Sequence, residues 1–279
     1  MQAVLYCAGL GDVIRVIYQT GAYKFISETT TPVKVLSASH NPFALEIFRH
    51  HRNAKNFVLH ELGHKYEEFL VSGLRGGDIN RALCEFAGVE PGDLVSGRPA
   101  EGYVPTFDAP DDIDSNGHIV FQPFAGSLMS RTFSEELTAK VVNVLRRLPC
   151  QVYLVTRSFT RKGTSGKVIH AEEDARQFEG GNIKVLEHLS VPGTLNLIKS
   201  SSAYVGSWSS LQQAAWFANK PVAVIYPPNW CDVVNRTGYA FGLDREDCFH
   251  TDWDVLDLGK LEQWFTRWCV TPQLPPVAP

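Results

Sequence analysis

The chain has 279 residues, a formal net charge of −4 at pH 7, and 44% hydrophobic residues. This length suits two domains of ordinary size, and the acidic balance excludes a general attraction to nucleic acid. The six cysteines are scattered without a CxxC pair, and the longest apolar stretches fall short of the roughly 20 residues that a membrane span needs. We therefore expect a cytoplasmic protein with reduced thiols and no membrane span.

The N-terminal segment joins an apolar strand to a glycine turn. Residues 3–7 form the strand, the turn contains Gly9 and Gly11, and Asp12 opens an apolar helix that begins at Val13. Glycine in such a turn lets another molecule approach the backbone at the carboxyl edge of an α/β sheet. Two roles are open for Asp12: a cap for the helix, or a carboxylate displayed to a ligand.

Alternating strands and helices follow, which predicts parallel sheets covered on both faces. We expect strands at 33–37 and 57–59, with a helix starting after Asn41-Pro42 between them, and a helix with a glycine break over 67–86. The next stretch is rich in Pro, Gly and Asp, and residues 108–117 are the expected linker.

The same pattern begins again at His118. The expected strands are 118–122, 151–155, 183–186, 203–206 and 222–226. The expected helices are 134–148, 191–199, 209–218 and 256–268. In the first of these helices, Glu136 is expected in a capping arrangement. We therefore expect an α/β fold of two Rossmann-like domains whose parallel sheets face a central cleft. The domains are 1–112, on the acceptor side, and 113–255, which binds the nucleotide, followed by a C-terminal helix and tail over 256–279.

Two turns of the second half suit an anion. In one, a strand ends in a turn with Pro and Gly, followed by Ser127 and Arg131; the other places Ser209 and Ser210 at a helix N-terminus. Backbone N–H groups, hydroxyls and a guanidinium together bind phosphate. The alternative is that these serines only cap their helices.

Two segments resemble a known family. Gly11-Asp12-Val13, and above all Ser-Trp-Ser-Ser-Leu-Gln-Gln-Ala-Ala-Trp-Phe-Ala-Asn-Lys-Pro-Val-Ala-Val-Ile-Tyr over residues 207–226, resemble the heptosyltransferase-like glycosyltransferases of the GT-B fold. The resemblance spans about residues 4–228. It implies an inverting, metal-independent transfer of a hexosyl, heptosyl or pentosyl group from a nucleotide-diphosphate sugar. We expect the acceptor to be a hydroxyl of a saccharide or lipid-linked glycan, and the donor to act as a co-substrate without a further cofactor.

The resemblance also implies roles for single residues. Asp12 corresponds to the general base of the family, and the turn at Ser209 and Ser210, with Gln213, corresponds to the site of the donor diphosphate. The sequence departs from the family at three of its positions: Trp208 stands in place of Asp, Ser210 in place of Gly, and Gln213 in place of His. The resemblance therefore does not specify which sugar or nucleotide is bound.

Further residues are expected near the two substrates. Glu187 and His188 directly follow a strand, where such folds bind the base or ribose, and Arg157 belongs to the same expected nucleotide site. On the acceptor side we expect Gly9, Gly11, Arg15, His60 and His64. For Glu187 and His188 the alternative is a surface loop, and for Arg15 it is a solvated helix charge.

Two other functions compete with this interpretation. His60-Glu61-Leu62-Gly63-His64 matches H-E-x-x-H, which on a helix places two imidazoles on one face for zinc, with a Glu as base. A zinc hydrolase is thus an alternative, although Gly63 weakens a helix and residues 57–59 suit a strand. The second alternative keeps the fold but transfers the sugar to a DNA base, as in some phages, with the basic segment 157–167 contacting phosphates.

Overall fold

The structure is a computed structural model that describes residues 3–7, 10–20, 27–28, 30, 33–37, 43–61, 104–115, 117–124, 131–156, 175–232 and 243–270. The chain divides into two compact units, Met1–Ile113 with Ser190–Lys199, and Asp114–Leu189 with Ser200–Pro279. The boundary after Ile113 lies inside the segment expected as a linker. Residues 190–199 group with the first unit, although their place in the sequence had put them in the second.

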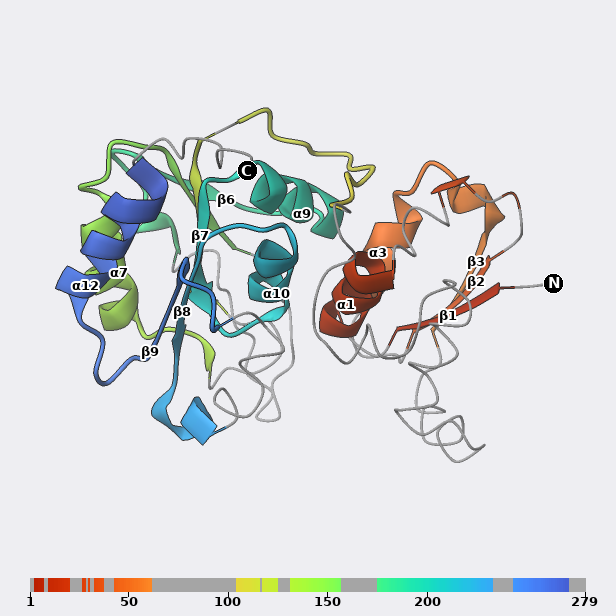
Figure 1. Ribbon diagram of the computed structural model, residues 1–279. Helices are drawn as coiled ribbons and strands as arrows, with labels where there is room; N and C mark the ends of the chain where they lie inside the picture. The colour runs from red at the N-terminus through yellow and green to blue at the C-terminus, as the bar shows by residue number, and fades with distance from the viewer. Residues whose placement is uncertain are drawn as a thin grey trace, which may run out of the picture. The chain divides into compact units, whose positions relative to one another are not determined.

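The described part of the first unit is a parallel sheet with helices (Figure 1). Its strands are in the order β1 (Ala3–Cys7), β2 (Val33–Ser37) and β3 (Phe57–Glu61). Helices α1 (Leu10–Thr20) and α3 (Phe43–Arg49) lie side by side, and a 3₁₀ turn, η1 (Ala54–Asn56), precedes β3. The apolar stripe of α1, which includes Ile14 and Ile17, is buried, as its helical periodicity predicts.

The second unit contains a six-stranded sheet whose neighbouring strands are all parallel. Its order is β6 (Ile183–Leu186), β5 (Val152–Val155), β4 (Ile119–Gln122), β7 (Ala203–Ser207), β8 (Val222–Tyr226) and β9 (Cys248–Asp252). The four strands β4, β5, β7 and β8 are buried throughout. Strand β9 was not predicted, because it is an edge strand that is only partly buried and lacks a continuous apolar run.

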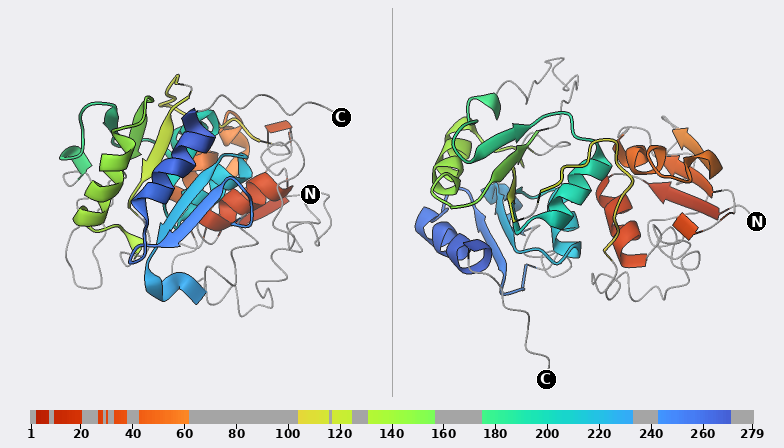
Figure 2. Two further views of the ribbon diagram at one scale, coloured as in Figure 1. Left: turned by 60° about the vertical axis from the view of Figure 1, so that its left-hand side comes forward. Right: turned by 90° about the horizontal axis from the view of Figure 1, so that it is seen from above.

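Helices cover both faces of this sheet. Helices α7 (Glu135–Leu145) and α12 (Leu258–Phe265) lie side by side over one face, where Val141, Leu261 and Phe265 join the apolar core (Figure 2). Helix α10 (Ser210–Phe217) packs on β7 and β8. The remaining elements are α9 (Val191–Ser200), the 3₁₀ turn η4 (Pro228–Trp230) and the π-helical turn η6 (Thr266–Val270).

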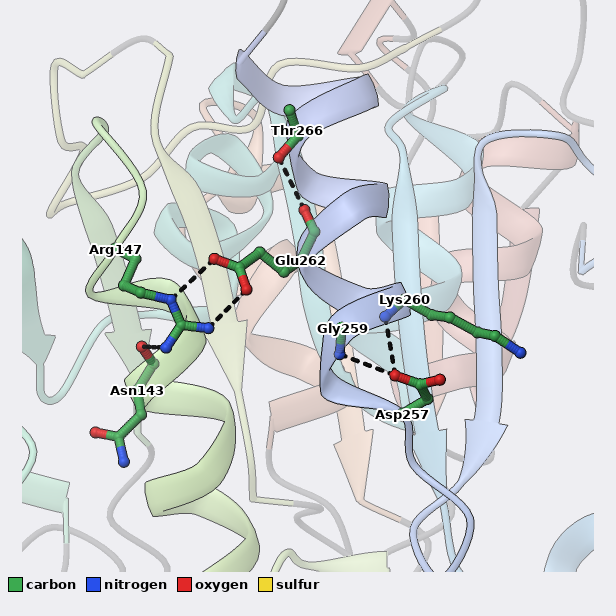
Figure 3. A network of polar contacts seen from close by, with 7 residues as sticks. All are labelled: Asn143, Arg147, Asp257, Gly259, Lys260, Glu262 and Thr266. Atoms are coloured by element: carbon green, nitrogen blue, oxygen red, sulfur yellow. Dashed lines mark hydrogen bonds and ion pairs between the residues drawn. The ribbon is translucent and has the colours of Figure 1, made fainter.

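Helices α7 and α12 both begin at side-chain caps. Ser134 accepts a hydrogen bond from the Leu137 N–H and caps α7. The capping role expected for Glu136 is wrong: it is one residue too early for the reciprocal bond, and its carboxylate pairs with Lys140 instead. Asp257 caps α12 by accepting bonds from two backbone N–H groups, as Figure 3 shows.

The same view shows how α7 and α12 are joined. The Arg147 guanidinium donates two hydrogen bonds, of 2.9 and 2.7 Å, to the Glu262 carboxylate (Figure 3). The pair is exposed, so water and salt weaken it, and burial of the apolar faces is the main attraction between the two helices. The expected C-terminal helix is therefore part of the second unit and not a separate element.

Four of the cysteines, Cys150, Cys231, Cys248 and Cys269, lie in the described part and are not joined in a disulfide there. Burial raises the pKa of the Cys150 and Cys248 thiols, and that of Cys248 to about 12, so both remain protonated at neutral pH. In the described part of the chain, helices are too short or too polar to cross a membrane.

Candidate functional site

The candidate site of the second unit lies at the carboxyl ends of β4 and β7. These strands are neighbours, and Gln122, the last residue of β4, is paired with Gly206 of β7. The turns after them are the two that the sequence analysis singled out for an anion, so topology brings the starts of both turns to one edge of the sheet. Ligands of open α/β sheets bind at this edge.

Arg131 is the cation of this site. Its Nη1 donates a 3.1 Å hydrogen bond to the Trp208 carbonyl, and its guanidinium carbon lies 4.3 Å from the centre of the Trp230 ring. Burial lowers the pKa of this guanidinium, and its Nε is buried without a hydrogen-bond partner among the described residues. Within the described part of the chain no carboxylate pairs with Arg131, so these residues leave its charge unneutralised.

The N-terminus of α10 lies beside this arginine, because Trp208 directly precedes the cap residue Ser209. Ser209 is extended, with a φ of −151°, and its hydroxyl accepts a bond from the Gln212 N–H. The N–H groups of Ser210 and Leu211 come before the first intrahelical bond and are free to meet a ligand. A cation beside a helix N-terminus is an arrangement that binds phosphate groups.

A second interaction fixes Ser209 from the side of β4. The Ser209 hydroxyl donates a 2.8 Å hydrogen bond to Oε1 of Gln122, and the Tyr204 hydroxyl donates one of 2.5 Å to the same oxygen. The Gln122 amide nitrogen donates to the Phe124 carbonyl in the turn after β4. Glycine is required at 206, because a Cβ there would collide with the Gln122 carbonyl oxygen.

Other polar atoms at the same edge are buried without a partner. The hydroxyls of Thr156, just after β5, and Ser207, the last residue of β7, have no hydrogen-bond partner among the described residues. The Gln213 side-chain oxygen, in the first turn of α10, is in the same state. Such atoms cost free energy unless another group meets them.

The expected nucleotide residues lie two strands away from β4, beyond β5. Glu187 and His188 follow β6, and both oxygens of the Glu187 carboxylate accept hydrogen bonds from Arg176 at 2.5 Å. These bonds and the charge of Arg176 hold the pKa of Glu187 below its usual value. His188 has a φ of +61°, in the left-handed region, so the chain turns sharply after β6.

In the first unit, the backbone places Asp12 inside a helix. Helix α1 starts at Leu10, before the expected start at Val13, so Asp12 is the third helical residue and not the N-cap. This first turn follows the carboxyl end of β1, and Gly11 lies in it too. Arg15 is three residues further along α1.

The zinc-binding interpretation of His60 and Glu61 is wrong in its helical form. Both residues belong to the strand β3 and not to a helix. The apolar run from Phe57 favours the strand, and its parallel pairing with β2 extends to Glu61. In the described part of the chain, His, Cys, Asp and Glu side chains form no cluster that suits a metal.

Some expected site residues lie outside the described residues. These are Gly9, His64, Ser127 and Arg157, with the basic segment 157–167.

The comparisons with known proteins add to this geometry. No protein-family model and no curated protein matches the sequence. Among solved structures, E. coli heptosyltransferase WaaC with ADP is similar, at a TM-score of 0.54 and 11% identity over 96% of this chain and 97% of that chain. E. coli ADP-heptose lipopolysaccharide heptosyltransferase II gives 0.53 and 11% over 97% and 99%. A family 9 glycosyltransferase from Veillonella parvula gives 0.53 and 10% over 96% and 97%.

The chain has the GT-B fold. The predicted fold class is thereby confirmed, and the similarity extends over nearly the whole length of each structure. At these identities the shared property is the backbone architecture. WaaC has also been solved with ADP-2-deoxy-2-fluoro heptose, a nucleotide-diphosphate sugar analogue.

Within this GT-B fold, sequence reasoning missed three residues of the candidate site. Gln122 carried a signal, because it is a polar residue at the end of an apolar strand. Tyr204 lies inside an apolar strand and Trp230 follows one, so neither residue differs in the sequence from an ordinary core aromatic. Their roles depend on pairing between strands, which residue spacing does not specify.

Proposed function

We propose that the protein is a glycosyltransferase of the heptosyltransferase type. It transfers a sugar from a nucleotide-diphosphate sugar to a hydroxyl of a saccharide or lipid-linked acceptor, with inversion and without a metal ion. The fold shared with two E. coli heptosyltransferases supports this class of reaction. The positive charge of Arg131 beside the N-terminus of α10 supports a donor that carries a diphosphate.

The single observation that carries the proposal is the charge of the site at α10. Arg131 is half-buried, lacks a carboxylate partner among the described residues, and hydrogen-bonds the residue just before the cap of α10. Desolvating a guanidinium beside a helix N-terminus is unfavourable unless an anion binds there. A diphosphate supplies that anion, and it becomes more negative as the sugar leaves.

The reaction is a single displacement. The acceptor oxygen attacks the anomeric carbon, the bond from that carbon to the diphosphate oxygen breaks, and the electron pair leaves with the nucleoside diphosphate. The Asp12 carboxylate takes the hydroxyl proton as general base. Arg131 and the N–H groups of Ser210 and Leu211 stabilise the departing diphosphate, as oxyanion-hole donors do.

The test is a binding measurement with the purified protein and the nucleoside diphosphates ADP, UDP, GDP and CDP. A diphosphate that binds only the folded state raises stability by about 2.7 kcal/mol at a hundredfold excess over Kd. We expect one of them to raise the melting temperature, and Arg131→Gln to weaken its binding by about tenfold or more, because a hydrogen bond to a charged group is lost. Mass spectrometry of the acceptor then identifies the transferred sugar.

Arg147→Gln is the matched control, because it removes an arginine of the same unit that is exposed and paired with Glu262. The control should bind the diphosphate as the wild type does. If none of the diphosphates binds, or if Arg131→Gln and Arg147→Gln behave alike, the proposed donor site is overturned. Turnover that requires added Mg²⁺ would contradict the metal-independent mechanism.

A further inference from the structure

We propose that Gln122 and Tyr204 are positioning residues for the donor diphosphate, a role that rests on the proposed function. Through Ser209 they hold the first turn of α10 in register with the turn after β4. The consequence for the ligand is specific: Ser210 and the helix N–H groups contact the diphosphate, and Ser209 does not.

Gln122, Tyr204 and Ser209 form a hydrogen-bonded cluster in which the hydroxyl hydrogens can be assigned. Tyr204 and Ser209 each have one hydroxyl hydrogen, and each donates it to Oε1 of Gln122, which has two lone pairs. The two hydroxyl oxygens lie 3.3 Å apart, yet neither has a second hydrogen for the other. Both lone pairs of Oε1 are therefore used, and the single hydroxyl hydrogen of Ser209 is in its bond to Gln122.

The Ser209 oxygen also accepts a hydrogen bond within the protein. The donor of this bond is the Gln212 N–H, and the bond caps α10. A phosphate oxygen needs a donor, so Ser209 has nothing to offer it without breaking the bond to Gln122. The hydroxyl of Ser210, one residue further and half-exposed, is not committed in this way among the described residues.

The amide nitrogen of Gln122 bonds to a second segment of the chain, the turn after β4. This nitrogen, Nε2, donates to the Phe124 carbonyl, in the turn that leads from β4 toward Arg131. One planar amide thus connects the turn after β4 to the cap of α10. Because the amide is rigid, moving either turn breaks a bond in the other, and buried networks that are fully satisfied hold a single arrangement.

The packing around the cluster leaves little room for another arrangement. Tyr204 is fully buried, and burial raises its pKa, so its hydroxyl remains a donor at every physiological pH. Gly206 lets β7 approach β4 closely enough for the Tyr204 hydroxyl to reach the amide, and a Cβ at 206 would lie 2.9 Å from that hydroxyl. The cluster is therefore built into the pairing of the two strands.

The experiment measures binding of inorganic pyrophosphate to the full chain by calorimetry, which makes the result independent of the nucleotide base. Tyr204→Phe should weaken binding by roughly 3- to 10-fold, the range for loss of one hydrogen bond. Combining Tyr204→Phe with Gln122→Leu removes both partners of a buried bond, which preserves folding, and should weaken binding by about tenfold or more. The KM for the donor should rise with binding, and the KM for the acceptor should not.

Three further variants separate positioning from a general effect on stability. Tyr153→Phe removes the hydroxyl of a buried tyrosine in β5, away from the carboxyl edge, and should leave pyrophosphate affinity unchanged. Ser209→Ala should weaken binding, and Ser209→Thr, which keeps both the cap and the bond to Gln122, should restore it. Hydrogen exchange over residues 207–217 should become faster in Tyr204→Phe and in Ser209→Ala.

The outcomes are distinguishable. If the wild type does not bind pyrophosphate, the proposed function is overturned, and the hydrogen-exchange comparison still decides whether the cluster holds the first turn of α10. If the wild type binds and Tyr204→Phe binds equally well, with unchanged exchange over 207–217, only the positioning role is overturned. If Ser209→Thr fails to restore binding, the claim that Ser209 acts through its hydroxyl is wrong.

Discussion

His51 is a buried histidine that the fold keeps neutral. Its Nδ1 accepts a 3.0 Å bond from the Asn53 N–H, so the hydrogen is on Nε2, which lies 2.9 Å from the Ser27 hydroxyl. Burial lowers the pKa of His51 below 6.5; Asp108 opposes this shift and Arg52 adds to it. Protonation of this one side chain therefore changes the free energy of unfolding of the first unit.

The sign of this effect follows from linkage. Below its ordinary pKa of about 6.5, His51 takes up a proton in the unfolded chain more readily than in the folded one. The stability contributed by neutral His51 is thus fully present above pH 6.5 and is lost as the pH falls through the lower folded-state pKa. We expect His51→Gln to flatten the fall in unfolding free energy between pH 7 and pH 5, measured by urea denaturation. His50→Gln is the control at an exposed neighbour, and equal pH slopes in the two variants would contradict the prediction.

At the scale of elements, helix α9 shows how one helix is attached to a loop. The Ser190 N–H donates a 2.6 Å bond to Asp111, and its hydroxyl donates to the second oxygen of the same carboxylate. The Val191 N–H donates a 2.6 Å bond to Glu46 of α3. Two carboxylates at a helix N-terminus also complement its dipole. Further along, Asn196 exchanges two 2.8 Å hydrogen bonds with the backbone of Phe107.

The bonds between Ser190 and Asp111 depend on glycine at position 193. We therefore predict that Gly193→Ala has opposite effects on stability with and without the Asp111 carboxylate. A Cβ at 193 would collide with the Asp111 carboxylate, so Gly193→Ala should destabilise the wild type. With Asp111→Ala already present, the collision is gone and the same change should stabilise by up to about 1 kcal/mol, the helix propensity of Ala over Gly. A double-mutant cycle of urea unfolding measures this coupling. Additive effects of the two substitutions would show that Gly193 and Asp111 do not meet.

Most elements could be predicted from the sequence because their patterns are local. The strands at 33–37, 183–186 and 222–226 occur where their apolar runs predict them, between turn residues. Strand β9 was missed because half-burial at the edge of a sheet removes the apolar run. The start of α1 was placed three residues late, since Leu10 and Gly11 read as a turn. The amide of Gln122 could not be foreseen, because its partners come from a strand 82 residues away and from the following cap.

At the scale of the molecule, the proposed chemistry is divided between the two units. Asp12 belongs to the first unit, and Arg131 and α10 belong to the second. In the proposed displacement, Asp12 takes the proton of the acceptor and Arg131 stabilises the departing diphosphate. Asp12→Asn should therefore lower the transfer rate by about 10²- to 10⁴-fold, the usual contribution of a general base, and leave donor affinity nearly unchanged.

Single-turnover rates and calorimetry with the bound nucleoside diphosphate measure these two quantities. Asp112→Asn, an exposed carboxylate of the same unit, is the control and should retain transfer. Transfer by Asp12→Asn within severalfold of the wild type would assign the base to another residue. A large loss of donor affinity would show that the two units do not divide the reaction.

The assignment of residues 190–199 to the first unit has a consequence for biosynthesis. Synthesis proceeds from the N-terminus, so Asp111 and Glu46 leave the ribosome long before the N–H groups of Ser190 and Val191 that they bind. By then β4, β5 and β6 have also been made. The first unit therefore cannot complete its contacts as a separate nascent domain, unlike multidomain proteins whose domains fold one after another during translation. The first unit reaches its final state only after α9 has been made, when three strands of the second unit are already present.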